Sequence, residues 1–258
     1  MIEVKTDHPL AVDIVDHIYP DGILFDNNSN FDYIGEVEQS FSGRKLKVLD
    51  LGCAGGQLAV DFFNRGHKSV GIEGSDYAIT YRLHNWPGYH NKCLFTADLR
   101  FPFEIIEDGE PMKFDFINSW EVFEHIPHKS LETFFYNIQR HLHPDGLFVG
   151  SVATGHSNRY VIRGSGQPDQ EVGNEQNFYV DMQAMLIYGP KLGSDWGIPR
   201  PITTEQLVEG NLVAYHQSVF QPEWWAQTMR HYFRVGAYPY RTLMRPGCSP
   251  YHFMLKQL

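Results

Sequence analysis

The stretch Lys47–Gly56, KVLDLGCAGG, decides the fold of this chain. A short apolar run, interrupted by Asp50, leads into a turn of small residues, which is typical of a buried parallel strand followed by a tight loop. The near absence of side chains in the loop lets a ligand approach the backbone closely. We expect the helix that follows, Gln57–Arg65, to direct its N-terminal N–H groups toward that ligand. Asp50 can accept hydrogen bonds from the loop or from a ligand cation.

An acidic residue ends the next predicted strand, Ser69–Glu73. It lies about twenty residues beyond the glycine-rich loop, where a carboxylate commonly binds ribose hydroxyls. By itself the loop is also compatible with a tight turn that binds nothing. The position of Glu73 favours a cofactor that contains a nucleoside.

Strands and helices alternate from Lys47 to Val152, which indicates parallel βαβ units. The further predicted elements are strands at Lys92–Thr96, Phe114–Asn118 and Leu147–Val152, helices at Tyr77–Leu83 and Lys129–His141, and a turn at His143–Gly146. Ligands of such sheets bind beyond the carboxyl ends of the strands. Small or polar residues occupy four of these ends, at Gly52–Gly56, Glu73, Asp98 and Asn118–Glu121.

Composition excludes several classes of protein. With 258 residues and 42% hydrophobic residues, the chain can bury the core of one sizeable α/β domain. Its net charge of -10 opposes binding to nucleic acid. No apolar run reaches the roughly 18 residues of a membrane span.

The N-terminal and cysteine patterns predict a cytoplasmic protein. MIEVKTDHPL lacks the basic and apolar regions of a secretory signal. The three cysteines, Cys53, Cys93 and Cys248, are widely spaced and form neither a metal-binding pair nor a disulfide framework, which suits a reducing compartment.

Together these motifs resemble the class I S-adenosylmethionine-dependent methyltransferases, over about residues 47–152. VLDLGCAGG is similar to the first motif of that family, hhDhGCGxG, with Ala54 where glycine is usual. GIEGSD is similar to the second strand, and Ala97-Asp98-Leu99 to the third motif. FDFINSWEVFEHI is similar to the stretch after strand four, and HPDGLFVG to the turn and strand that follow.

The resemblance implies a Rossmann-like, doubly wound α/β fold. Its seven-stranded sheet is mostly parallel with an antiparallel last strand, and we expect the final strands at Phe233–Tyr240 and Tyr251–Lys256 after a helix at Pro222–His231. We expect one domain over residues 1–258, with a helical cap at 1–44, a cofactor-binding core at 45–153, an insertion at 154–215, and a C-terminal helix and β-hairpin at 216–258. The cap, with helices at His8–Ile18 and Phe31–Phe41, either leans over the cofactor mouth or merely covers the sheet.

The resemblance also implies how S-adenosylmethionine is held. The loop backbone should follow its methionine part, with Asp50 and the Asn118 carbonyl near its ammonium group. Glu73 should accept from both ribose hydroxyls, and Asp98 from the adenine amino group, with the Leu99 amide nearby. The predicted cofactor-binding residues are Asp50, Gly52, Cys53, Ala54, Gly56, Glu73, Gly74, Asp98, Leu99, Asn118, Trp120 and His125.

Several residues near the end of the fourth strand leave alternatives open. Trp120 either shields the adenine or packs at the strand end, and His125 either packs at the cofactor mouth or hydrogen-bonds the loop. Two histidines and a carboxylate in Glu124–His128 suggest a zinc site on a helix, but this stretch contains Pro127 and belongs to the EHI element of the family. No metal is therefore expected.

The stretch Thr154–Tyr215 is long, polar and rich in glycine, with helical spacing at Phe178–Tyr188. A long insertion of this kind is usually a lid or a binding loop, and it lies where this family builds its acceptor site. Its aromatic and polar residues suit a polar or glycosylated small molecule, although the insertion is also compatible with an oligomer contact. The sequence leaves the oligomeric state open.

An oxygen acceptor requires removal of its proton, and histidine is the usual base near neutral pH. His156 follows the fifth strand and His216 precedes the final helix, so both are candidates for this role. We therefore predict a small-molecule methyltransferase with a slight preference for oxygen. A nicotinamide-dependent oxidoreductase is disfavoured because the loop lacks GxGxxG, and a non-catalytic cofactor-binding module is a third hypothesis.

Overall fold

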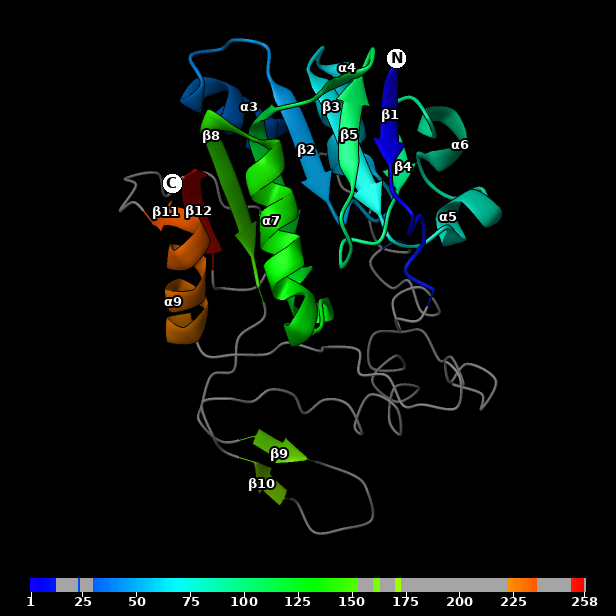
Figure 1. Ribbon diagram of the computed structural model, residues 1–258. Coiled ribbons are helices and arrows are strands. Elements are labelled where there is room, and N and C mark those ends of the chain that lie inside the picture. Colours follow the sequence, from blue (N-terminus) through cyan, green and yellow to red (C-terminus); the bar gives the residue numbers. More distant parts are fainter. Residues whose placement is uncertain are drawn as a thin grey trace.

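The computed structural model describes residues 1–12, 23, 30–152, 160–162, 170–172, 222–235 and 252–257. A seven-stranded sheet forms its centre, in the order β11-β12-β8-β7-β2-β3-β4 (Figure 1). These strands are β2 (Lys47–Leu51), β3 (Lys68–Glu73), β4 (Leu94–Thr96), β7 (Phe114–Trp120), β8 (Leu142–Ser151), β11 (Phe233–Val235) and β12 (His252–Gln257).

The sheet is parallel except at one strand. β2 pairs in parallel with β3 and β7, β3 with β4, and β7 with β8. β12 is antiparallel to both of its neighbours, β8 and β11. The predicted Rossmann-like architecture, with an antiparallel final strand, is thereby confirmed.

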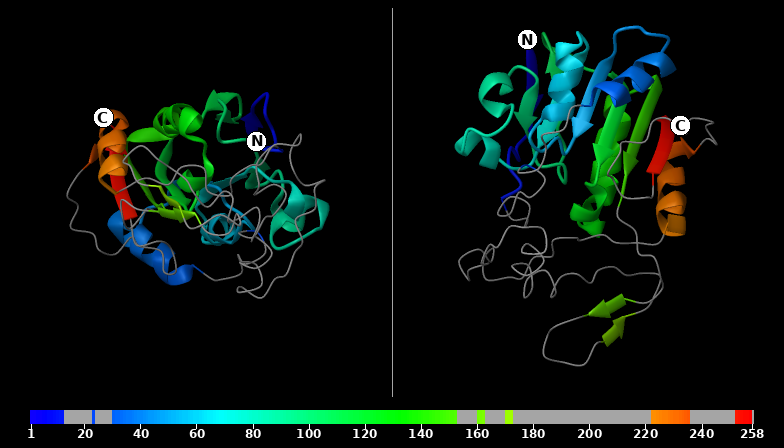
Figure 2. Two further views of the ribbon diagram at one scale, coloured as in Figure 1. Left: turned by 90° about the horizontal axis from the view of Figure 1, so that it is seen from below. Right: turned by 180° about the vertical axis from the view of Figure 1, so that it is seen from behind.

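Helices cover both faces of the sheet (Figure 2). They are α3 (Phe31–Ser40), α4 (Gln57–Asn64), α5 (Tyr77–Thr80), α6 (Trp86–Tyr89), α7 (Leu131–His141) and α9 (Pro222–Tyr232), with 3₁₀ turns η1 (Phe123–His125) and η2 (His128–Ser130). One buried cluster joins the sheet to α7 and α9, and another joins it to α3 and α4. Neighbouring residues of β2 alternate between them, Val48 facing α3 and α4 and Leu49 facing α7, because successive side chains of a strand point to opposite faces.

The predicted helix at His8–Ile18 is wrong at its start. Residues 8–11 form no helix, and the remainder from residue 13 lies outside the described residues. Pro9 disfavours helical geometry at His8. The preceding residues form β1 (Ile2–Lys5), antiparallel to β5 (Glu104–Glu107) in a second, three-stranded sheet.

That second sheet also contains β6 (Glu110–Pro111), which forms a hairpin with β5. Asp108 and Gly109 both have positive φ, 53° and 92°, as a type I′ turn requires. The sequence analysis missed this hairpin, although Asp-Gly between two extended runs is its usual signal.

The predicted turn at His143–Gly146 lies inside β8 rather than before it. Phe114 of β7 is opposite Leu142, whereas Phe116 is opposite Leu147, so extra residues leave the ladder between these pairs. β8 therefore contains a bulge at this turn and pairs with β7 again after it.

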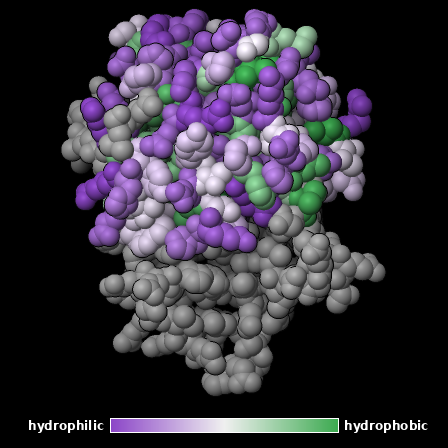
Figure 3. Space-filling view, viewed as in Figure 1, coloured by the Kyte–Doolittle hydropathy of each residue, from purple (hydrophilic) through white to green (hydrophobic). Residues whose placement is uncertain are grey.

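Several other predictions fall outside the described residues. They include the helix at Phe178–Tyr188 and most of the insertion, of which only the antiparallel pair β9 (Tyr160–Ile162) and β10 (Gln170–Val172) is described. Hydrophilic residues predominate on the face of the described part shown in Figure 3. No helix among the described residues combines the length and apolarity that a membrane crossing requires.

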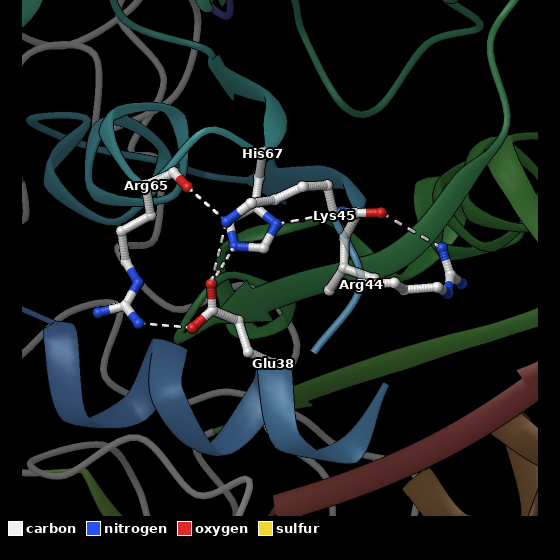
Figure 4. A network of polar contacts seen from close by, with 6 residues as sticks. Glu38, Arg44, Lys45, Arg65 and His67 are labelled. Carbon is white, nitrogen blue, oxygen red and sulfur yellow. Dashed lines mark hydrogen bonds and ion pairs between the residues drawn. The ribbon is translucent and has the colours of Figure 1, made fainter. Parts of the chain in front are cut away.

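An ionic network stabilises the amino-terminal edge of the sheet (Figure 4). Glu38 of α3 accepts from Arg65 at 2.5 Å and from Nε2 of the buried His67 at 2.8 Å. The Leu46 N–H donates to Nδ1 of the same ring at 3.1 Å, so that nitrogen is unprotonated and the ring is neutral. Burial lowers the pKa of His67, and the hydrogen bond from Arg65 lowers the pKa of Glu38 from 4.5 to about 2.

We expect Glu38→Gln to lower the free energy of unfolding by about 1–2 kcal/mol at neutral pH, because it leaves Arg65 without its carboxylate. The folded pKa of Glu38 lies below the unfolded one. Its contribution is therefore complete above pH 4.5 and is lost as the pH falls toward 2. Urea unfolding across this range measures both effects.

Glu36→Gln on the same helix is the matched control, and it should change stability by less than about 0.5 kcal/mol. Equal losses in the two variants, or a Glu38→Gln loss that persists unchanged in acid, would contradict this account of the network.

Candidate functional site

The loop after β2 is held by backbone bonds and by glycines that have no room for a side chain. Gly52 and Cys53 both donate to the Ile72 carbonyl of β3, at 2.8 and 3.0 Å. Gly52 and Gly56 have positive φ, 73° and 82°. A Cβ on Gly52 would lie 2.3 Å from Val122, so this glycine is required by packing as well as by backbone geometry.

Ala54 adopts the left-handed conformation, with φ of 49°. This conformation is costly for a residue with a side chain, and neighbouring groups must hold it. The Ala54 N–H donates to Glu73 Oε2 at 2.8 Å, and the Ala54 carbonyl accepts from the indole of the buried Trp86 at 2.8 Å. Ala54 departs from the family motif, and the peptide group on each side of it is held by one of these hydrogen bonds.

Glu73 joins this loop to the turn after β3. One carboxylate oxygen accepts from Ala54, and the other accepts from the Ser75 N–H at 3.1 Å. A carboxylate has about four acceptor sites on its two oxygens, so it can accept from several donors at once. Glu73 therefore has the chemistry to bind a diol while it holds the loop.

Asp50 and Asn118 lie side by side on the paired strands β2 and β7. Both are buried, with exposed fractions of 3% and 0%. The Asn118 amide donates to the Leu49 carbonyl at 3.3 Å, and its Oδ1 has no hydrogen-bond partner among the described residues. A buried acceptor without a donor is costly, and a cationic ligand group beside Asp50 would satisfy it.

Asp98 follows β4, and its carboxylate faces Arg100. Arg100 Nε lies 2.9 and 3.0 Å from the two oxygens, and Nη2 lies 2.5 Å from Oδ2. Both side chains are buried, with exposed fractions of 2% for Asp98 and 10% for Arg100. Leu99 is also buried, and no described residue accepts from its N–H.

The N-terminal arm, residues 6–11, crosses these strand ends, which the sequence analysis did not foresee. The His8 carbonyl accepts from Asp98 N–H at 2.9 Å, and the Ala11 N–H donates to the Gly74 carbonyl at 2.8 Å. A Cβ on Gly74 would lie 3.0 Å from Ala11, so the arm approaches the sheet closely at this glycine. The sequence signal for this crossing was the polar, proline-containing stretch after an alternating Ile2–Lys5.

Residues at the end of β7 and just after it pack against other parts of the chain. Trp120 is buried in the cluster under α3 and makes an edge contact with Tyr33, with ring centroids 5.7 Å apart. His125 is half-buried in η1, and its N–H donates to the Val122 carbonyl. Glu121 has a strained backbone, with φ of 54°, and its carboxylate accepts from Ser151 of β8.

The parallel strands therefore bring most of the predicted cofactor residues to one edge of the sheet. They come from the ends of β2, β3, β4 and β7. The predicted bases, His156 and His216, lie outside the described residues. Among the described residues no group of three or more histidine, cysteine, aspartate or glutamate side chains is placed to hold a metal ion.

Comparison with known families identifies this architecture. A family model described as "Methyltransferase domain" matches residues 28–232, which is well over half of the chain. The match includes the glycine-rich loop, all four strand ends and the insertion. It does not favour the nicotinamide-dependent alternative.

Curated relatives match shorter stretches. The ubiquinone biosynthesis O-methyltransferase of Alkalilimnicola ehrlichii is 30% identical over 102 residues, which cover 39% of each chain. The protein of the same name from Glaesserella parasuis is 29% identical over 133 residues, or 50% of this chain and 54% of the relative. The chain thus spans between about a third and a half of the length of the curated relatives it matches.

Solved structures of similar fold are more distant in sequence. The PH0226 protein of Pyrococcus horikoshii is 16% identical with a TM-score of 0.47, covering 97% of this chain and 95% of that one. The glycopeptide N-methyltransferase MtfA in complex with S-adenosylmethionine is 13% identical with a TM-score of 0.48, covering 90% and 94%. These likenesses are too distant to support a conclusion about activity.

Trp86→Phe tests the support of the loop. It keeps a buried ring but leaves the Ala54 carbonyl without its donor. We expect a loss of about 1 kcal/mol in the free energy of unfolding. We also expect severalfold weaker binding of S-adenosylmethionine, because the loop is then less well fixed. Urea unfolding and calorimetry measure the two effects.

Tyr89→Phe is the matched control, since it removes a hydrogen bond to Asn64 from the same helix, α6, without touching the loop. Unchanged cofactor affinity in Trp86→Phe would show that the indole has no part in positioning the loop.

Proposed function

The chain belongs to the methyltransferase-domain family of S-adenosylmethionine-dependent enzymes, and from this premise we propose that it transfers a methyl group to an oxygen atom of a small, polar or glycosylated molecule. The observation that carries the proposal is the Glu73 carboxylate, which links the loop after β2 to the end of β3, where a carboxylate commonly accepts from ribose hydroxyls. The similarity to O-methyltransferases supports the preference for oxygen.

The cofactor would lie along the carboxyl edge of the sheet. Glu73 would accept from both ribose hydroxyls, and the peptide units of Gly52, Cys53 and Ala54 would follow the methionine part. Asp50 and the unsatisfied Asn118 Oδ1 would accept from the ammonium group. The buried orphan acceptor is an observation on this chain that fits such a cation.

The adenine would bind beside β4, where Asp98 supplies an acceptor and the Leu99 N–H supplies a donor. Gly56 would begin the helix that faces the ligand, and Gly74 would admit the N-terminal arm beside the ribose. For Trp120 and His125, packing under α3 and within η1 supports a role in shaping the mouth of the site.

When bound, S-adenosylmethionine supplies an electrophilic methyl group on a sulfonium. The remaining task of the protein is to align the acceptor and to remove its proton. We assign acceptor binding to the insertion at 154–215, and removal of the proton to His156, near the start of the insertion, or to His216, which follows its end. The segments 1–44, 45–153 and 216–258 would serve as cap, cofactor core and closing hairpin of one domain.

Calorimetric titration with S-adenosylmethionine and S-adenosylhomocysteine tests the cofactor site. We expect Glu73→Ala to weaken both ligands at least tenfold, because it removes the ribose acceptor and frees the Ala54 loop. Glu36→Gln, in helix α3, should bind both ligands with the affinity of the wild type. Wild-type protein that binds neither ligand would contradict the proposed cofactor site.

Formation of S-adenosylhomocysteine in the presence of a metabolite extract tests turnover. We expect replacement of the base, by His156→Ala or His216→Ala, to slow turnover by about 10²-fold or more with little change in cofactor affinity. The slowed rate should recover as the pH is raised, because an acceptor hydroxyl then ionises without a base. If neither variant is slowed, neither histidine is the base.

Cofactor binding without turnover on any acceptor would favour the remaining hypothesis, a non-catalytic module that recognises a partner through its insertion.

A further inference from the structure

The side chain of Arg100 fills the acceptor sites of the Asp98 carboxylate. An ionised carboxylate has about four lone-pair sites on its two oxygens. Here Oδ1 accepts from the Arg100 backbone N–H at 3.0 Å and from Nε at 2.9 Å. Oδ2 accepts from Nε at 3.0 Å and from Nη2 at 2.5 Å. All four contacts come from one residue, and three of them come from its guanidinium.

The backbone around this pair is held from three sides. The Asp98 N–H donates to the His8 carbonyl at 2.9 Å, and the Phe101 N–H donates to the Asp98 carbonyl at 3.2 Å. The buried Asn137 of α7 donates to the carbonyls of Leu99 and Phe101, at 3.4 and 2.8 Å. Asp98 therefore cannot move away from Arg100 without breaking the turn, so an exchange of partners at this carboxylate requires movement of the arginine side chain.

The guanidinium also lies over an aromatic ring. The Arg100 Cζ is 5.6 Å from the centre of the Phe101 ring. His8 of the N-terminal arm stacks on that ring at 3.7 Å, with an angle of 17°. A guanidinium that leaves a carboxylate loses less when it remains over an aromatic face.

We propose that Arg100 determines nucleobase selectivity by competing with the adenine amino group for Asp98. This inference rests on the proposed function, which assigns the adenine edge to Asp98 and Leu99. An adenine amino group can reach the carboxylate after the guanidinium swings out. The arginine thus lowers the apparent affinity for the adenosyl ligand by the fraction of molecules in which Asp98 is open.

The competition also affects which base is accepted. Adenine presents an amino donor to this position, and hypoxanthine presents a keto acceptor in its place. The open carboxylate attracts the first and repels the second, whereas Arg100 in its paired position donates to a keto oxygen. Removing the guanidinium should therefore strengthen the binding of the adenine ligand but not that of the hypoxanthine ligand.

Calorimetry with S-adenosylhomocysteine and its inosine analogue tests the proposal on wild type, Arg100→Met and Asp98→Asn. Methionine keeps much of the apolar stem without the charge. We expect Arg100→Met to bind S-adenosylhomocysteine about fivefold or more tightly, and the inosine analogue no more tightly than the wild type does. Asp98→Asn should weaken S-adenosylhomocysteine.

Arg140→Met is the matched control, because it removes an arginine from a partly exposed ion pair with Glu104 and should change neither affinity. Should Arg100→Met fail to fold, Arg100→Lys retains the charge without the two-pronged contact, and a smaller gain in affinity is expected from it. Circular dichroism reports folding in each case.

Equal or weaker binding of S-adenosylhomocysteine to the folded Arg100 variants would overturn the role of Arg100 alone. Unchanged binding to Asp98→Asn would overturn the adenine contact on which it rests. A wild-type protein with no affinity for S-adenosylhomocysteine would instead overturn the proposed function, so the failures are distinguishable.

Discussion

The candidate site depends on one carboxylate, that of Glu73. It accepts from Ala54 in the loop after β2 and from Ser75 in the turn after β3, and so ties together the two segments that flank the cofactor position. The left-handed Ala54 is strained, and that strain is sustained because Glu73 and Trp86 hold the peptide units on its two sides. The proposed ribose-binding residue is thus also one of the two residues that hold Ala54 in a conformation for which glycine is usual.

Most strands of the sheet could be predicted because short, contiguous sequence patterns specify them. Lys47–Leu51 is apolar, ends in a glycine-rich turn and forms β2 with the predicted bounds. The N-terminal strand could not be predicted in the same way, since Ile2–Lys5 pairs with Glu104–Glu107, about a hundred residues away. A four-residue strand carries too little periodicity to be recognised without its partner. The Asp108-Gly109 turn was a usable signal for the hairpin that supplies this partner.

In the candidate site, too, the features specified by local sequence could be predicted and those that depend on distant contacts could not. Glu73 and Asp98 could be found because parallel strands place their carboxyl ends at one edge, so position in sequence implies position in space. The contact between Arg100 and Asp98, and the arm that carries His8 to the same turn, could not be found, because they depend on side-chain rotamers and on a distant chain segment. Such contacts determine how accessible Asp98 is to a ligand, and the sequence motif around Asp98 does not reveal them.

The two edges of the sheet satisfy their polar groups in opposite ways. At the amino edge, Glu38 has both Arg65 and His67 as donors, and the buried histidine is neutral, so the charges there are matched by the protein itself. At the carboxyl edge, Asn118 Oδ1 has no donor among the described residues, and Asp98 is satisfied by the side chain of Arg100. A buried acceptor left without a donor costs stability, and a counter-charge that must move aside for a ligand lowers the affinity for that ligand. Both costs would be offset by a ligand with matching donors at that edge, as the proposed cofactor has.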